Sequence, residues 1–260
     1  MRKGMLGRSV AISFLQGFRA PFEGVSFLWG NRGLWRYVWI PFLVNVLLFL
    51  GLGVIFVALY PGLIQHLLPS GDAWYLSLLR ALLWAVGSAI LAIGFLLVFT
   101  VVGNLIAGPF NDALSERVEG SMGGHVRPAR GLGSQLGELG RTALEEVKRV
   151  LFFMAGSLVL LLWNLIPGVG QAIYTVTAGI WTLLFLALEF GDYYLVRHWV
   201  RFRTRWALIW SHRWSSLGFG LGASLLLMIP IVNLLLIPCA VTGGTLLWLR
   251  LAPSQGESRR

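Results

Sequence analysis

Long runs without charge dominate the pattern of hydrophobic and polar positions along the chain. Residues 38–60 contain no charged side chain. A helix of that length measures about 34 Å, enough to cross roughly 30 Å of hydrocarbon. Residues 81–110 are again free of charge, so we predict a second transmembrane helix over 75–110. This helix is longer than the bilayer core is thick, so it must tilt strongly or project from the membrane before Gly108 and Pro109 perturb it.

Two further apolar stretches, 151–188 and 217–249, are interrupted by proline turns at Pro167-Gly168 and at Pro230. The first legs measure only about 24 Å and 18 Å, shorter than the hydrocarbon core. Turns that emerge into water normally carry charge, and neither turn does. The pattern therefore predicts two re-entrant, half-penetrating helical hairpins, which are stable only when buried in protein or beside a water-filled cavity.

The remaining segments are more polar. Residues 111–149 combine acidic and basic side chains with helically spaced apolar ones, which predicts a cytoplasmic helical region. Residues 1–36 predict an amphipathic helix at the membrane interface. We expect one all-α integral membrane domain over 1–260, with two long transmembrane helices, two membrane hairpins and this cytoplasmic region.

Composition and charge support a membrane protein and orient it. Hydrophobic residues make up 57% of the chain and charged residues 12%, too few charges for a water-exposed surface. The formal net charge is +10, but the basic residues flank the apolar runs, as expected beside anionic lipids, and we predict no nucleic-acid partner. By the positive-inside rule, both termini and residues 111–149 face the cytoplasm, and the loop at 61–74 faces out.

Catalytic chemistry has little support. The four histidines lie in separate segments without metal-ligand spacing, the single cysteine excludes an internal disulfide, and no nucleotide-binding loop is present. We predict no cofactor and no enzyme. Asp112, Glu116 and Glu119 are spaced to form a carboxylate site, but a solvated helix start capped by Asn111 or Asp112 is the commoner interpretation. Residues 120–124 are interpreted as a flexible turn.

A binding site is better supported just before the first span. Arg32 and Arg36 flank Gly33, where a backbone without a Cβ lets a ligand approach and a helix N-terminus offers unpaired N–H groups. Two guanidiniums there suit a tetrahedral oxyanion. The alternative is that both arginines anchor the helix to lipid phosphates. Other charges have simpler interpretations: Arg201, Arg203 and Arg205 as a topology signal, and Glu189 and Asp192 as cap or salt-bridge residues.

Two motifs resemble the CysZ sulfate-permease family. One is the segment 33–41 followed by Asn45, and the more specific one is 108–119. With the Ile-Pro turns, the resemblance covers about residues 14–249. The motif residues that carry it in the second segment are Pro109, Phe110, Asn111, Asp112, Ser115 and Glu116.

The resemblance implies a bacterial inner-membrane protein that admits sulfate for cysteine synthesis and assembles as a homo-oligomer. It also implies an anion site at a Gly-Leu-Arg-Arg stretch, which here corresponds to Gly33, Leu34, Trp35 and Arg36. Trp35 replaces the first arginine of the family pattern, and Arg32 can restore its charge from the neighbouring turn. The alternatives are a non-transporting membrane scaffold and, third, a membrane enzyme based on the three carboxylates.

Overall fold

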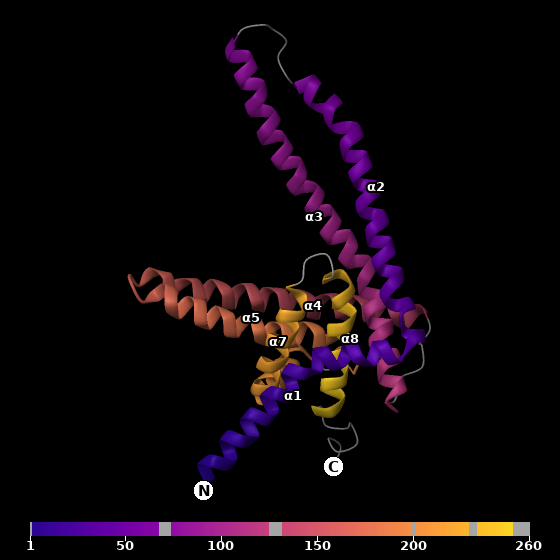
Figure 1. The fold of residues 1–260 in the computed structure, drawn as a ribbon, viewed down its shortest axis with the longest axis vertical. Helices are drawn as coiled ribbons and strands as arrows, with labels where there is room; N and C mark the ends of the chain where they lie inside the picture. The colour runs from indigo at the N-terminus through magenta and orange to yellow at the C-terminus, as the bar shows by residue number, and fades with distance from the viewer. Residues whose placement is uncertain (1, 68–73, 125–131, 199–200, 229–232, 252–260) are drawn as a thin grey trace. The chain divides into compact units, whose positions relative to one another are not determined.

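The computed structural model describes residues 2–67, 74–124, 132–198, 201–228 and 233–251, and all regular structure in these ranges is helical. The expectation of an all-α protein is confirmed. The longer helices run in the order shown in Figure 1: α1 (Arg2–Gly30), α2 (Arg36–Leu67), α3 (Trp74–Ser121), α4 (Leu132–Leu161), α5 (Gly170–Leu195), α6 (Phe202–Ser211), α7 (Arg213–Leu227) and α8 (Asn233–Leu251). Two short 3-10 helices, η1 (Arg32–Leu34) and η2 (Leu162–Leu165), lie in the connections.

Three helical segments are long and apolar enough to cross a membrane: Arg32–Ile55, Trp74–Phe99 and Gly170–Leu195. Each contains 24 to 26 residues, and a helix of that length is longer than the hydrocarbon core is thick. The third lies partly within the predicted hairpin 151–188 and extends past its end. The structure thus supports a helical membrane protein.

The chain divides into two compact units, residues 38–110 and residues 1–37 together with 111–260. In the first unit, α2 and α3 approach each other in antiparallel order. The ring of Phe49 lies 5.5 Å from Phe95 and 5.3 Å from Phe99 between centroids. About one turn from these rings, Asn45 is buried against Gly103, where a Cβ would lie 2.7 Å from the Asn45 Oδ1.

The core of the second unit forms where α1 crosses α7 and α8. Gly218 and Gly222 of α7 lie against the backbone of α1 at Phe14 and Phe18, and Gly243 of α8 lies against Ala20. A Cβ at any of these glycines would collide with a carbonyl oxygen of α1. The helices therefore pack at backbone contact distance. One face of α1 is consequently buried in protein, a feature that the prediction of an interfacial helix did not contain.

The connection between α4 and α5 is a helical hairpin, and its two helices run side by side in Figure 1. Ile166 adopts an extended conformation, as the residue before a proline usually does, and so the helical run ends ahead of Pro167. Gly168 then takes a φ of +81°, which an L side chain rarely adopts, and the Gly170 N–H closes the turn on the Ile166 carbonyl at 3.1 Å. The Leu165, Ile166 and Val169 side chains around the turn are exposed and apolar. Pro230, the other predicted turn, lies outside the described residues.

Helix boundaries differ from those expected near 110 and 150. Pro109 lies inside α3, which continues to Ser121, and α4 already begins at Leu132. Proline removes one helical hydrogen bond, but the next turns of α3 are held by burial of Asn111, Leu114 and Ser115. Asn111 and Asp112 are therefore interior helix positions, and their interpretation as helix caps is wrong.

The end of α3 explains the glycines that follow the motif. The Gly124 N–H bonds to the Glu119 carbonyl at 3.0 Å and the Gly123 N–H to the Gly120 carbonyl at 3.2 Å. With Gly123 at a φ of +79°, this is the Schellman ending of a helix. The predicted turn is thus a defined C-terminal cap.

Candidate functional site

The predicted anion segment forms the connection between α1 and α2. The Asn31 side-chain amide donates to the Phe27 carbonyl at 2.7 Å and so caps the end of α1. One turn of η1 follows, with the Leu34 N–H on the Asn31 carbonyl at 2.9 Å and the Trp35 N–H on the Arg32 carbonyl at 3.2 Å. The segment is therefore a structured turn, and α2 begins at Arg36.

Arg32, Gly33 and Arg36 are exposed on this turn. The Arg36 guanidinium donates to the Tyr37 hydroxyl at 3.2 Å and lies 4.9 Å from that ring's centroid. Among the residues that the structure describes, no carboxylate lies within ion-pair distance of Arg32 or Arg36. The space where Gly33 would carry a Cβ is open. The turn thus presents two guanidiniums that described acidic groups do not neutralise.

Leu34 and Trp35 are half-buried and have a packing role in the turn. The indole of Trp35 meets that of Trp29 edge to face, with centroids 5.6 Å apart. This contact joins the last turn of α1 to the start of α2. At this position, where the resemblance implied an arginine, the Trp35 side chain thus makes an aromatic packing contact.

The motif residues after Pro109 form a buried polar cluster. Asn111, Ser115 and Glu119 recur every four residues on one face of α3, and Glu119 is only 2% exposed. Arg197, in the turn after α5, donates to the Glu119 carboxylate at 3.2 Å, to the Ser115 hydroxyl at 2.7 Å and to the Asp112 carbonyl at 3.1 Å.

Two more contacts complete this cluster. His198 Nε2 lies 2.7 Å from the second oxygen of Glu119, and the Ser115 hydroxyl lies 2.8 Å from that of Thr245 on α8. The motif therefore ties the end of α3 to the end of α5 and to α8. Since Glu119 is held by an arginine and a histidine, the interpretation of these carboxylates as a solvated helix start is wrong for Glu119.

A second network, which joins the middle of α4 to the last turn of α5 and to α6, was not predicted as a unit. Asp192 pairs with Arg205, which is 1% exposed, and with Arg149 at 3.2 Å. The assignment of Arg205 to a topology signal is wrong, while the salt-bridge interpretation of Asp192 is confirmed. The sequence did contain a hint of this pair, because Arg149 and Asp192 lie on the two charged sides of the apolar stretch 151–188.

Glu145 extends this network to α6. Its carboxylate accepts the Phe202 N–H at 2.9 Å, at the first residue of α6, and pairs with Lys148 at 2.6 Å. The hydrogen bond from Lys148 and then that from Phe202 hold the pKa of Glu145 below its usual range. The carboxylate satisfies an N–H that a helix N-terminus leaves unpaired.

A family model described as Sulfate transporter CysZ/Etoposide-induced protein 2.4 matches residues 20–238. The match includes the turn at Arg32 to Arg36 and the motif residues 108–119. The chain belongs to this family. The resemblance inferred from the two motifs is thereby confirmed, and the family's description names a transporter, in agreement with the prediction that the chain is not an enzyme.

Curated members of the CysZ family match most of the chain. A sulfate transporter CysZ of Pseudomonas aeruginosa is 33% identical over 231 residues, covering 88% of this chain and 92% of the relative. That of Pseudomonas fluorescens is 32% identical over 224 residues, covering 85% and 88%. That of Pectobacterium atrosepticum is 31% identical over 223 residues, covering 83% and 78%.

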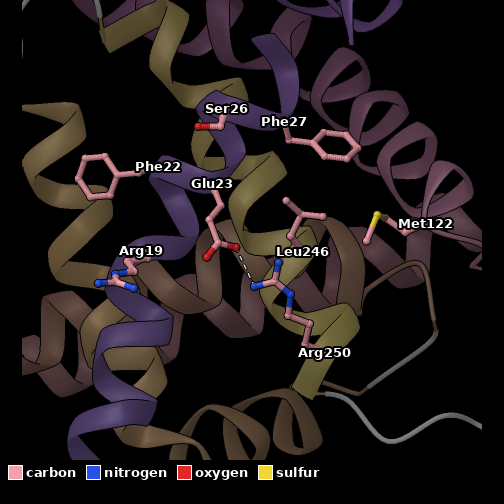
Figure 2. Close-up of a pocket in the computed structure, with 8 residues that line it drawn as sticks. All are labelled: Arg19, Phe22, Glu23, Ser26, Phe27, Met122, Leu246 and Arg250. Carbon is pink, nitrogen blue, oxygen red and sulfur yellow. Dashed lines mark hydrogen bonds and ion pairs between the residues drawn. The ribbon is translucent and has the colours of Figure 1, made fainter. Parts of the chain in front are cut away.

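Apart from these clusters, the structure has an open cleft of about 530 Å³ beside α1 and α8. Its polar lining comprises Arg19, Glu23 and Ser26 on α1 and Arg250 on α8, and Figure 2 shows the ion pair of Glu23 with Arg250. Sequence reasoning did not single out any of these residues as a site.

Proposed function

We propose that this protein takes up sulfate across the bacterial inner membrane and supplies it for assimilation into cysteine. The observation that carries the proposal is the exposed Arg32 and Arg36 pair at the start of α2, in a chain of a family described as sulfate transporters. Sulfate is a tetrahedral dianion, and guanidiniums bind such oxyanions through charge-assisted hydrogen bonds.

The backbone of the turn adds to this chemistry. The first N–H groups of α2 have no partner within the helix, and the helix dipole places partial positive charge beside Arg36. The open side of Gly33 lets an anion approach the main chain. The half-buried Leu34 and Trp35 hold the turn in place, so Arg32 and Arg36 supply the charge of the proposed site.

We propose further that the α4–α5 hairpin penetrates the membrane from the cytoplasmic side, the side of both termini, without reaching the other face. The ion pair of Arg149 with Asp192 supports this, because it joins the charged ends of both legs at one level. From Arg149 through η2 the first leg measures about 26 Å, and the apolar part of α5, from Gly170 to Leu188, about 27 Å, both less than the hydrocarbon core. The exposed apolar faces of this hairpin and of α2 and α3 suit lipid contact and a homo-oligomer.

The test is labelled-sulfate uptake into proteoliposomes containing the purified full-length protein. We expect saturable uptake above empty vesicles, lost in Arg36→Gln and reduced in Arg32→Gln. Arg203→Gln is the matched control, because Arg203 is an exposed arginine on α6. We expect Trp35→Arg, which restores the family cation, to lower the half-saturating sulfate concentration.

Other outcomes would overturn the proposal or part of it. If folded wild-type protein gave no flux, the protein would be a membrane scaffold. If both arginine variants kept full sulfate uptake, these arginines would be lipid anchors and the anion site would lie elsewhere. Competition by sulfite, thiosulfate and chloride would establish which anion the site prefers.

A further inference from the structure

We propose that the cleft beside α1 and α8 binds a phospholipid whose headgroup is a phosphodiester carrying a primary ammonium, as in phosphatidylethanolamine. The proposal concerns residues other than the anion segment and does not depend on sulfate transport. It rests on the charges of the cleft, on its apolar walls and on its position at the end of an apolar helix.

The charges of the cleft suit a zwitterion. Arg19 and Arg250 supply two cations and Glu23 supplies one carboxylate, which leaves a single excess positive charge for a phosphodiester. Arg19 has no carboxylate within ion-pair distance among the residues described. Glu23 uses Oε2 to pair with Arg250 at 2.7 Å, and within the described ranges no donor is bonded to its Oε1. That oxygen can accept a hydrogen bond from an ammonium group.

The walls of the cleft suit the lipid's acyl portion. Phe22, Phe27, Met122 and Leu246 contribute apolar surface beside the charged groups, and Figure 2 shows the phenylalanines on either side of Glu23. Phe22 and Met122 are substantially exposed, at 39% and 54%. A free inorganic anion would leave this apolar surface uncovered, whereas an amphiphile would remove it from water.

The place of Arg250 on α8 puts the charges of the cleft at the level of the lipid headgroups. Residues 217–249 contain no charge, and Arg250 is the first charged residue after them. Cations at the end of an apolar helix lie where lipid phosphates lie. Arg250 and its partner Glu23 thus meet the headgroup at the level where the apolar part of α8 ends.

The experiment measures lipid binding to the full-length protein in detergent by native mass spectrometry, with dioleoyl lipids bearing ethanolamine, choline or glycerol headgroups. Choline has a quaternary ammonium that cannot donate to Glu23. We expect the ethanolamine lipid to bind about tenfold more tightly than the choline lipid, the amount that one charge-assisted hydrogen bond provides. Equal binding of these two lipids by the wild-type protein, or a preference for the glycerol lipid, would overturn the proposal without any variant.

Variants then assign the effect to the cleft. Glu23→Gln should remove the preference for ethanolamine over choline without weakening the glycerol lipid, and Arg19→Gln should weaken all three lipids. The matched controls are Glu146→Gln, an exposed carboxylate paired with one arginine, and Arg203→Gln. An unchanged preference in folded Glu23→Gln would contradict the assignment, as would soluble phosphoethanolamine or inorganic phosphate binding as tightly as the lipid.

Discussion

Asp192 shows how much a single residue can contribute to this fold. Its carboxylate is 5% exposed and accepts from Arg205 and Arg149, which come from different helices. Arg205 is buried, and without Asp192 its nearest described carboxylate would be that of Glu145 at 3.9 Å. Removing one member of such a pair is costly, because it leaves charge without compensation in a poorly solvated environment.

We predict that Asp192→Asn lowers the free energy of unfolding by about 3–5 kcal/mol. Glu146→Gln removes a half-exposed carboxylate that pairs with Arg149, and it should lower the free energy of unfolding by only about 0–1 kcal/mol. The measurement is the unfolding midpoint of both variants in one detergent. Equal midpoints for the two variants would show that the buried ion pairs of Asp192 contribute no more to stability than the exposed pair of Glu146.

The depressed pKa of Glu145 predicts a dependence of stability on pH. Because the folded pKa lies below the unfolded one, the ionised carboxylate stabilises the fold above the unfolded value of about 4.3. That contribution is lost as the pH falls through the folded pKa. We therefore expect Glu145→Gln to be less stable than wild type at neutral pH and to lose less stability on acidification below about pH 4. Parallel pH profiles for the two proteins would contradict this.

For single residues, the sequence predicted where the arginines lie along the helices better than it predicted which carboxylates they pair with. The exposed Arg32 and Arg36 stand where the pattern placed them, because both flank the start of a long apolar helix. Arg197 and Arg205 belong to the same basic segment in sequence, yet they enter different buried networks. Which carboxylate an arginine meets depends on how helices far apart in sequence pack, and local spacing does not contain that information.

Among the elements, the contact of α1 with α7 depends on the absence of side-chain atoms. We predict that Gly222→Ala destabilises the fold by about 1–3 kcal/mol, because the added methyl meets the Phe18 carbonyl. Gly94→Ala is the control, since the space around Gly94 is open. There alanine should be neutral or stabilising by about 0.5–1 kcal/mol, because glycine is a poor helix former. Thermal unfolding of both variants tests this, and similar losses would contradict the packing explanation.

Element boundaries could be predicted only where a strong local signal exists. The turn at Pro167-Gly168 combines a residue that terminates a helix with one that tolerates a positive φ, and the structure has a turn there. Pro109 carries the same terminating signal, but α3 continues through it because the following turns are buried. Tertiary packing overrides local preference in such cases.

For the whole molecule, the depth of the α4–α5 hairpin is the feature to test. In a Cys239→Ser background, we expect Leu165→Cys at the exposed tip to resist a membrane-impermeant thiol reagent from both sides, because the proposed depth places this tip within the hydrocarbon. Arg203→Cys should react only from the cytoplasmic side. Labelling of the tip from outside the cell would show instead that the hairpin crosses the membrane.

Fold class and membrane location followed from the length and composition of the apolar runs, which reflect the thickness of a bilayer. The docking of α1 did not follow from them. Its glycines and apolar residues suit an interfacial helix equally well, and only the matching glycines on α7 and α8 give that face a protein partner.

The docking of α1 also has a consequence for biosynthesis. The ribosome makes α1 before α7 and α8, and the helices that cover it begin about 180 residues after its end. At roughly 5–20 residues per second, the first helix waits on the order of 10–40 s for its partners. During that interval its glycine-bearing face lacks the helices that cover it in the folded protein, so a nascent chain interrupted before α7 leaves α1 unassembled.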